Sequence, residues 1–216
     1  MTFVLVVAGW IFSLCLHEFS HAAVAYLGGD TTVREKGYLT FNPLRYTDPV
    51  LSIVMPLLFL LIGGLGLPGG AVYIDRSRLR SRHWSSAVSL AGPLSNALLA
   101  VLLALPFRLG LAGDGGIWPG LAFLGLLQVS AVLLNLIPIP PLDGYGILAP
   151  YLSPSVRRQM ASVGTWGLWV VFLVMWYVPL ANEAFWSAVY GLSGHLGVPP
   201  FLAMIGLQGF QFWRGR

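Results

Sequence analysis

The sequence predicts an all-α polytopic membrane protein, a bundle of about five or six transmembrane helices with a short membrane-associated β segment. Of its 216 residues, 56% are hydrophobic and only 9% are charged, whereas a soluble domain carries about a quarter charged residues. Mean hydropathy is +0.77. Six apolar runs follow one another along the chain, and three of them comfortably reach the ~20 residues that a spanning helix needs.

The six runs define the expected helices. The first, third and fourth are long enough to span, the fifth is marginal and the last is broken. The second contains Pro56 and ends in a glycine-rich stretch, so it either crosses as a short span or re-enters. We expect one integral-membrane domain over 1–216, with its core motifs in 3–27, 85–105 and 117–146. The runs cover residues 3–27, 50–67, 85–105, 117–137, 163–178 and 184–212.

Composition excludes several other classes of protein. The net charge of +4 could suit nucleic acid, but the basic residues lie beside apolar runs, which indicates contact with lipid head groups. The lone Cys15 excludes an internal disulfide and a cysteine zinc cluster. The first ten residues carry neither a positive charge nor a small-residue cleavage site, so the first run is expected to be retained as a span.

The basic residues favour one topology. If all six runs span, the twelve Lys and Arg residues divide eight to four between the two sides. If the second run re-enters, eleven share one side and Arg108 is alone on the other. That split becomes nine to three if the last run does not span. Because basic residues gather on the cytoplasmic side, we expect the re-entrant arrangement, with the N-terminus outside.

A brief strand is expected between the first two runs. Side chains alternate there over four residues, and Asn42-Pro43 ends the pattern. The segment could be an interfacial anchor, or its exposed edge could pair with an unwound substrate by β-addition. The residues concerned are Tyr38, Leu39, Thr40 and Phe41.

The first run carries three ionisable residues in the motif HEFSH, namely His17, Glu18 and His21. Positions i and i+4 of a helix share a face, so both imidazoles can bind one ion, and Glu18 can reach a water held by that ion. This is the HExxH pattern of zinc proteases. A purely structural role would place all three groups in hydrocarbon, at roughly 2–3 kcal/mol or more for each charged one. We therefore favour metal binding.

A site with two histidines needs a third protein ligand. Most of the eight acidic residues lie in charged loops, whereas Asp143 lies in NLIPIPPLDGYG at the end of an apolar run. Pro138, Pro140 and Pro141 should unwind the helix so that this carboxylate turns inward, and a carboxylate suits zinc. Taken alone, Asp143 could instead cap the following segment, since Asp-Gly is a common turn.

The two parts of this site constrain the direction of their helices. His17 and His21 lie near the C-terminal end of the first run, and Asp143 follows the C-terminal end of the fourth. Both can reach one ion only if the two spans run in the same direction. This requires the second run to return to its starting side, as the basic residues already suggest. The metal site should then lie nearer the cytoplasmic face.

Three motifs in this order, HEFSH at 17–21, LAGPLSN at 90–96 and NLIPIPPLDG at 135–144, resemble the site-2 protease family of intramembrane zinc metalloproteases. GYLTFNPLRYTDP at 37–49 resembles the membrane-associated β segment of the small prokaryotic members. The chain departs from better-known members in having neither a PDZ nor a CBS domain. The resemblance implies one Zn²⁺ held by His17, His21 and Asp143, with Glu18 as catalytic base, and substrate or transition-state support from Asn135 and Asn96.

Plainer interpretations remain for the supporting residues. Asn96 could make only an interhelical hydrogen bond. Asn135 lies three residues before the first proline, where freed backbone groups need partners, and we favour a substrate role for it. The small residues of 89–95 could simply permit close helix packing.

The expected function is zinc-dependent hydrolysis of peptide bonds in or near transmembrane segments of membrane-anchored substrates. A metal transporter and a catalytically silent membrane-binding homologue are the alternatives. A transporter should show polar residues along a whole path and often repeated halves, and the sequence shows neither. We expect a multi-pass protein of the prokaryotic inner membrane, with a membrane-anchored protein or peptide and the lipid bilayer as partners and no nucleic acid. The oligomeric state is left open.

Overall fold

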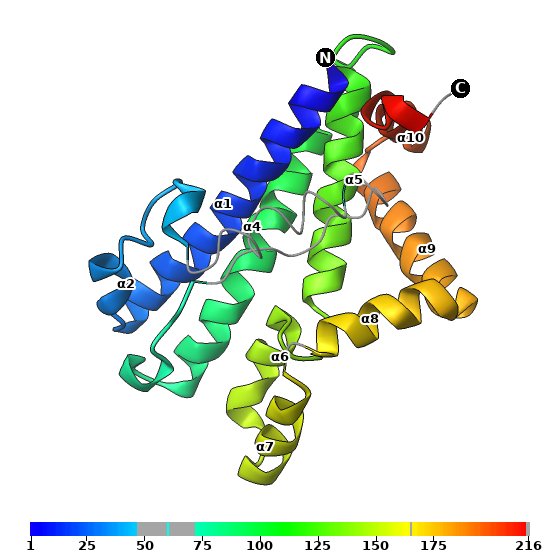
Figure 1. Ribbon diagram of the computed structural model, residues 1–216. Helices are drawn as coiled ribbons and strands as arrows, with labels where there is room; N and C mark the ends of the chain where they lie inside the picture. Colours follow the sequence, from blue (N-terminus) through cyan, green and yellow to red (C-terminus); the bar gives the residue numbers. More distant parts are fainter. Residues whose placement is uncertain (47–59, 61–71, 165, 215–216) are drawn as a thin grey trace.

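The computed structural model describes residues 1–46, 60, 72–164 and 166–214, and this part of the chain is helical and without strands (Figure 1). The described residues form nine α-helices and several short 3-10 helices (η), whose numbering along the chain has gaps. The elements are α1 (Thr2–Gly28), α2 (Thr32–Glu35), η1 (Pro43–Arg45), η3 (Arg76–Arg78), α4 (Arg82–Arg108), α5 (Trp118–Asn135), α6 (Asp143–Leu148), η4 (Ala149–Tyr151), α7 (Pro154–Val163), α8 (Trp166–Tyr177), α9 (Pro179–Leu196), α10 (Pro200–Phe210) and η5 (Phe212–Arg214).

Helices α1 and α5 run in the same direction. Leu5 near the start of α1 lies against Gly120 near the start of α5. Further along, the Ser13 hydroxyl of α1 donates a hydrogen bond of 2.6 Å to the Gln128 side chain of α5. The parallel orientation expected from the positions of the two histidines and Asp143 is therefore present.

Helix α4 runs antiparallel to both and lies along α1. Its first turn approaches the end of α1, where Gly28 lies against the Trp84 ring, and Asn96 in its middle contacts His17. The start of α4 is set locally, because the Ser81 side chain accepts a hydrogen bond from the Trp84 backbone N–H. Figure 1 shows α4 ending near the N-terminus, where a short loop leads into α5.

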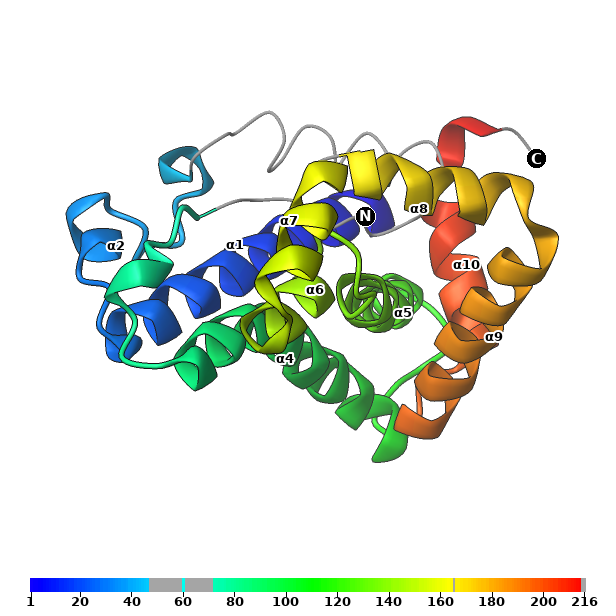
Figure 2. The same ribbon diagram turned by 90° about the horizontal axis from the view of Figure 1, so that it is seen from below.

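Helix α5 is the centre of the bundle. Viewed along its axis in Figure 2, it is enclosed by α1, α4, α9 and α10. Its sequence is apolar around most of its circumference, as expected for a helix buried on every side, and fourteen of its eighteen residues are buried. Phe123 and Leu127 belong to the large apolar core that α5 shares with its neighbours.

The last apolar run is broken, as the sequence predicts. It forms α9 and α10, which meet at an angle of 116°; Pro199 lies in the break between them and Pro200 begins α10. Helix α10 folds back onto α5 and onto the start of α1. The Phe210 ring stacks on Phe3, with centroids 5.4 Å apart, and also contacts Phe123.

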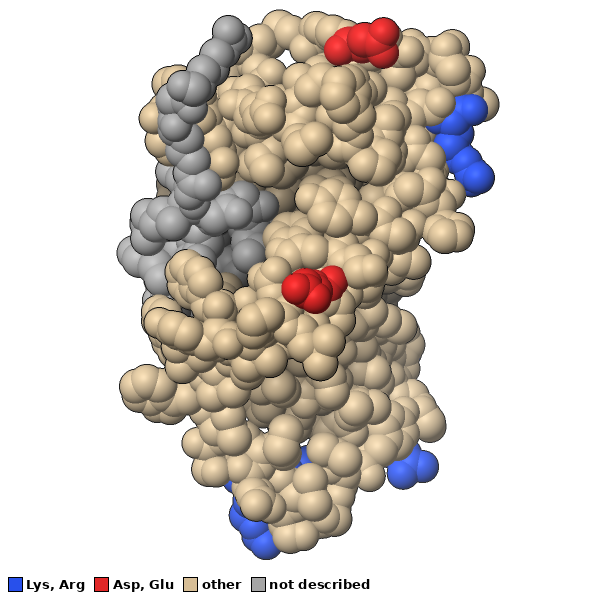
Figure 3. Space-filling model, turned by 90° about the vertical axis from the view of Figure 1, so that its right-hand side faces the viewer, with Lys and Arg blue, Asp and Glu red and all other residues tan. Residues whose placement is uncertain are grey.

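The outer surface is that of an integral membrane protein. Three described helices, α1, α4 and α5, are long and apolar enough to cross a membrane, or up to five spans exist if each bent pair of helices counts as one. In the face drawn in Figure 3, charged residues are few, and basic side chains gather at the lower end of the molecule with one further group higher up. The second predicted run, 50–67, lies outside the described residues apart from Leu60. The expectation that this run re-enters the membrane therefore falls on residues that are not described.

The expected strand at Tyr38–Phe41 is wrong. The Tyr38 backbone N–H donates to the Val33 carbonyl, which closes the end of α2, and the Thr40 carbonyl accepts from the Tyr46 hydroxyl. Phe41 stacks on Phe19 of α1, with ring centroids 4.8 Å apart. The backbone is thus bonded locally and the segment lies against a helix, so a preformed edge for a substrate has no basis here.

Replacing Gly206 by Ala should destabilise the bundle. The new methyl would fall on the Pro119 carbonyl and on Cβ of Phe123, where α10 packs on α5. Overpacking of this kind costs about 1–3 kcal/mol. Thermal unfolding in detergent, followed by circular dichroism, should show a lower midpoint than for wild type.

Gly191→Ala is the matched control, because a Cβ at this helical glycine meets nothing within 4 Å. Alanine also favours the helix over glycine, so this midpoint should hold or rise. Indistinguishable midpoints for Gly206→Ala and wild type would contradict the packing of α10 on α5.

Candidate metal centre

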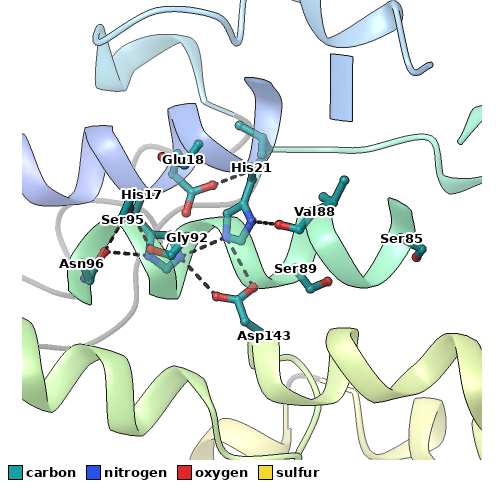
Figure 4. A network of polar contacts seen from close by, with 12 residues as sticks. His17, Glu18, His21, Ser85, Val88, Ser89, Gly92, Ser95, Asn96 and Asp143 are labelled. Carbon is teal, nitrogen blue, oxygen red and sulfur yellow. Dashed lines mark hydrogen bonds and ion pairs between the residues drawn. The ribbon is translucent and has the colours of Figure 1, made fainter. Parts of the chain in front are cut away.

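Two histidines of α1 and one aspartate of α6 converge on a single point. The Nε2 atoms of His17 and His21 lie 3.0 Å apart, as expected for side chains one helical turn apart on the same face. His17 Nε2 is 3.2 Å from Asp143 Oδ2, and His21 Nε2 is 3.4 Å from Asp143 Oδ1. In Figure 4 the two rings come from one helix and the carboxylate approaches from the opposite side.

The proline-rich turn after α5 delivers the carboxylate. Helix α5 ends at Asn135, and the chain turns through residues 136–142 before α6 begins at Asp143. The three prolines of this turn lack the N–H groups that a continuing helix would need. Gly144 allows the turn to be tight, because a Cβ there would fall on the Leu136 backbone carbonyl.

The other ring nitrogens of both histidines are held in place. His21 Nδ1 lies 2.6 Å from the Val88 carbonyl, and His17 Nδ1 lies 3.0 Å from Oδ1 of Asn96. Since both partners accept, each imidazole donates from Nδ1 and its neutral form presents a bare lone pair at Nε2. Metal-bound histidines typically donate their second N–H to a carbonyl or a carboxylate in this way.

The donor set fits a zinc ion. When both histidines are neutral, two lone pairs and a carboxylate face one another, and this arrangement can accommodate a cation. Ligand atoms about 2.0–2.2 Å from a tetrahedral zinc ion lie about 3.3–3.6 Å from one another. The two Nε2 atoms lie 3.0 Å apart, and they lie 3.2 and 3.4 Å from different oxygens of the Asp143 carboxylate, which comes close to that geometry. One ligand atom from each of the three residues lies within 4.8 Å of the others.

Gly92 of α4 supplies the space for the centre. A Cβ on this residue would fall on Nε2 of both His17 and His21. Any other residue at this position would therefore occupy the place where the ligand atoms meet. Figure 4 shows Gly92 directly beside the rings.

Glu18 lies next to the three donors but is not one of them. It is buried on α1, and its Oε2 accepts a hydrogen bond of 3.2 Å from the Val72 backbone N–H. Segment 72–75 is itself attached to the end of α1, because the Asp75 backbone N–H donates to the buried Asp30 carboxylate over 2.7 Å. Glu18 is thus held by a backbone group while its carboxylate stays close to the histidines.

The remaining candidate residues lie at different places. Asn96 accepts a hydrogen bond from His17, so its side chain orients a donor of the candidate metal centre. Asn135 is buried at the end of α5, and it is not one of the three residues whose donor atoms meet at the centre. Segment 38–41 packs against Phe12 and Phe19 of α1.

Sequence reasoning missed the groups that support the site. The Val88 carbonyl and the Val72 N–H are backbone atoms, which no residue type reveals. Gly92 was recognised only as part of a small-residue stripe. Its neighbour Pro93 inside a long apolar helix was the signal that this stretch of α4 is unusual.

Comparison with known proteins identifies relatives along almost the whole chain. "Putative zinc metalloprotease Rip2" of Mycolicibacterium smegmatis is 47% identical over 98% of this chain and 81% of its own length. The protein of the same name from Mycobacterium tuberculosis is 45% identical with the same coverage. "Putative zinc metalloprotease YwhC" of Bacillus subtilis is 36% identical over 82% of this chain and 81% of its own length. No family model matches the chain, and no solved structure matches it significantly.

Replacing Gly92 by Ala should abolish zinc binding, because the methyl would occupy the point where the two Nε2 atoms meet. Purified wild-type protein should contain about one zinc per chain by elemental analysis. Gly92→Ala should contain almost none. Gly194→Ala is the control, since a Cβ at that helical glycine meets nothing within 4 Å. A full zinc content in Gly92→Ala would contradict the assigned position of the centre.

Replacing Asn96 by Leu should weaken zinc binding about 10- to 100-fold, because similar volume is kept while the acceptor for His17 Nδ1–H is lost. Competition with a zinc chelator gives the affinity. Ser130→Ala is the control, since that buried hydroxyl bonds only to the Leu127 carbonyl of its own helix. Equal affinities in Asn96→Leu and wild type would show that Asn96 does not orient the ligand.

Proposed function

The chain belongs to the site-2 protease family of zinc metalloproteases, and we propose that it hydrolyses peptide bonds in or near transmembrane segments of membrane-anchored substrates. The observation that carries this proposal is the meeting of two histidines, an aspartate and a neighbouring glutamate among apolar helices. Ionisable groups at such a depth are costly and are kept for function.

His17, His21 and Asp143 would hold the zinc ion and leave its fourth position open for chemistry. When bound there, zinc polarises a carbonyl and lowers the pKa of water towards about 7. Asn96 and the Val88 carbonyl keep both imidazoles in the tautomer that points Nε2 at the ion.

Glu18 is the proposed general base. Its carboxylate takes a proton from the attacking water and then delivers it to the leaving amine. The Val72 N–H fixes one of its oxygens, which limits the rotation of the side chain. Asn135 is buried at the end of α5, and we propose that its amide supports the substrate backbone as a donor.

A substrate helix has to unwind before it can be cut, because each of its carbonyls is hydrogen-bonded and shielded. Proline and glycine near the cleavage point would ease that step. We place the N-terminus outside and the centre nearer the cytoplasmic face of a prokaryotic cell membrane, since most basic residues then lie on the cytoplasmic side. The whole chain would act as one integral-membrane domain.

Replacing Glu18 by Gln should stop cleavage without removing zinc. The amide cannot accept the proton, so hydrolysis of a model single-span substrate in vesicles should fall about 10²- to 10⁴-fold. Elemental analysis should still find about one zinc per chain, because Glu18 is not among the three donors.

Ser20→Ala is the control for this test, since the hydroxyl bonds only to the Leu16 carbonyl of its own helix. Equal product from Glu18→Gln and wild type would remove Glu18 from the mechanism. Zinc flux across the vesicle membrane without any cleavage would favour a transporter. Binding of the substrate without cleavage by the wild type would favour a silent homologue.

A further inference from the structure

A cavity of about 560 Å³, lined by both polar and apolar residues, adjoins the metal centre. It lies between the first turns of α4 and the segment from α6 to α7, at the end of the bundle where basic residues gather in Figure 3. Asp143, whose side chain is 18% exposed, lines it and faces both histidines. An occupant of the cavity is therefore next to the reaction centre. The residues that matter here are Arg76, Arg82, Ser85, Ser89, Asp143 and Arg157.

Arg76 is fixed within this cavity. Its Nη1 donates to the carbonyl oxygen and the hydroxyl of Ser85, and its Nη2 donates to the Ser89 hydroxyl over 2.9 Å. The guanidinium is thus anchored by hydrogen bonds to neutral groups. A guanidinium held in a fixed orientation is the preferred partner of a carboxylate, which it can bind through two parallel hydrogen bonds.

Basic residues outnumber acidic ones in the cavity, with three arginines and one aspartate in its lining. Across the described chain, none of Arg76, Arg82 and Arg157 forms an ion pair with a carboxylate. Asp75, the acid nearest to Arg76 in sequence, is already engaged. It pairs with Arg78 over 3.1 Å, and hydrogen bonds from Ser77 hold the pKa of Asp75 below its usual range.

One face of α4 connects this basic cavity to the metal centre. Ser85, Ser89, Gly92 and Asn96 follow one another at helical spacing, from Arg76 to the ring of His17. Figure 4 shows them in a row along the helix, with Asp143 opposite Ser89 and Gly92. A peptide with its scissile bond at the centre would therefore place its flanking residues beside Arg76.

We propose that this cavity binds an acidic side chain of the substrate, in the polar segment that flanks the cleaved helix, and that Arg76 determines this specificity. The inference rests on the proposed proteolytic function. Asp143 lines the cavity, so whatever occupies it lies beside the metal centre where the peptide is cut. A side chain of the substrate itself is therefore favoured over a lipid head group.

Cleavage of matched substrates tests the proposal. Single-span peptides carrying Glu at successive flanking positions, each paired with its Gln counterpart, are presented in phosphatidylcholine vesicles. At one position the wild type should show kcat/KM about fivefold higher for Glu than for Gln. In Arg76→Gln the ratio should fall to about one, and in Arg76→Glu a Lys peptide should be preferred. Arg158→Gln is the control, since Arg158 neighbours Arg157 on α7 but does not line the cavity.

A binding assay separates this inference from the proposed function. Fluorescently labelled Glu and Gln peptides are titrated into Glu18→Gln protein, and anisotropy gives both Kd values without any cleavage. The Glu peptide should bind about fivefold more tightly, and the added Arg76→Gln change should remove the difference. Zinc content checks that each variant is folded.

Three outcomes would overturn the inference. The first is equal affinity of Glu18→Gln protein for both peptides, and the second is a preference that survives Arg76→Gln. The third is an effect of Arg76→Gln that depends on phosphatidylglycerol added to the vesicles and not on the charge of the peptide. That result would assign the cavity to a lipid head group. A different result would reject the proposed function and retain the carboxylate site. In that case the wild type would not cleave either peptide, but the protein would still bind the Glu peptide more tightly than the Gln peptide.

Discussion

Three electron-pair donors that face one another inside an apolar bundle are the constraint on which the structure depends. His17 and His21 are fixed through Nδ1 by acceptors, so their Nε2 lone pairs point at each other and at the Asp143 carboxylate. Such a group of acceptors is repulsive in a medium without water, and each charge at that depth costs roughly 2–3 kcal/mol or more. A zinc ion held by the three groups would convert that repulsion into attraction, which would explain why they are tolerated there.

The same constraint sets how the helices pack. Helix α4 has to approach α1 closely enough for Val88 and Asn96 to reach the imidazoles, and Gly92 makes that approach possible. Helix α5 has to run parallel to α1 so that the turn after it ends at the level of the histidines. The central position of α5, enclosed on all sides in Figure 2, keeps the turn that carries Asp143 in a fixed place.

The parts of the site that depend on side-chain type and helical spacing could be predicted from sequence. The i, i+4 histidines and the proline-rich turn before Asp143 are of this kind, and so is the parallel direction of two spans that share one centre. The Val88 carbonyl and the Val72 N–H could not be predicted, because every residue has these groups and only the packing selects which are used. The strand at 38–41 failed because a four-residue alternation carries no information about a pairing partner, and local bonds to Val33 and Tyr46 took its backbone groups instead.

The third donor comes from a part of the chain far from the other two. A ribosome-bound chain that has inserted only its first span already contains His17, Glu18 and His21, yet Asp143 has not been synthesised. Until α5 is in place and the following turn has docked, such a nascent chain holds an incomplete set of donors. If Asp143 is the third ligand, a hydrolase that resides among other membrane helices would thereby be kept inert during its own biogenesis.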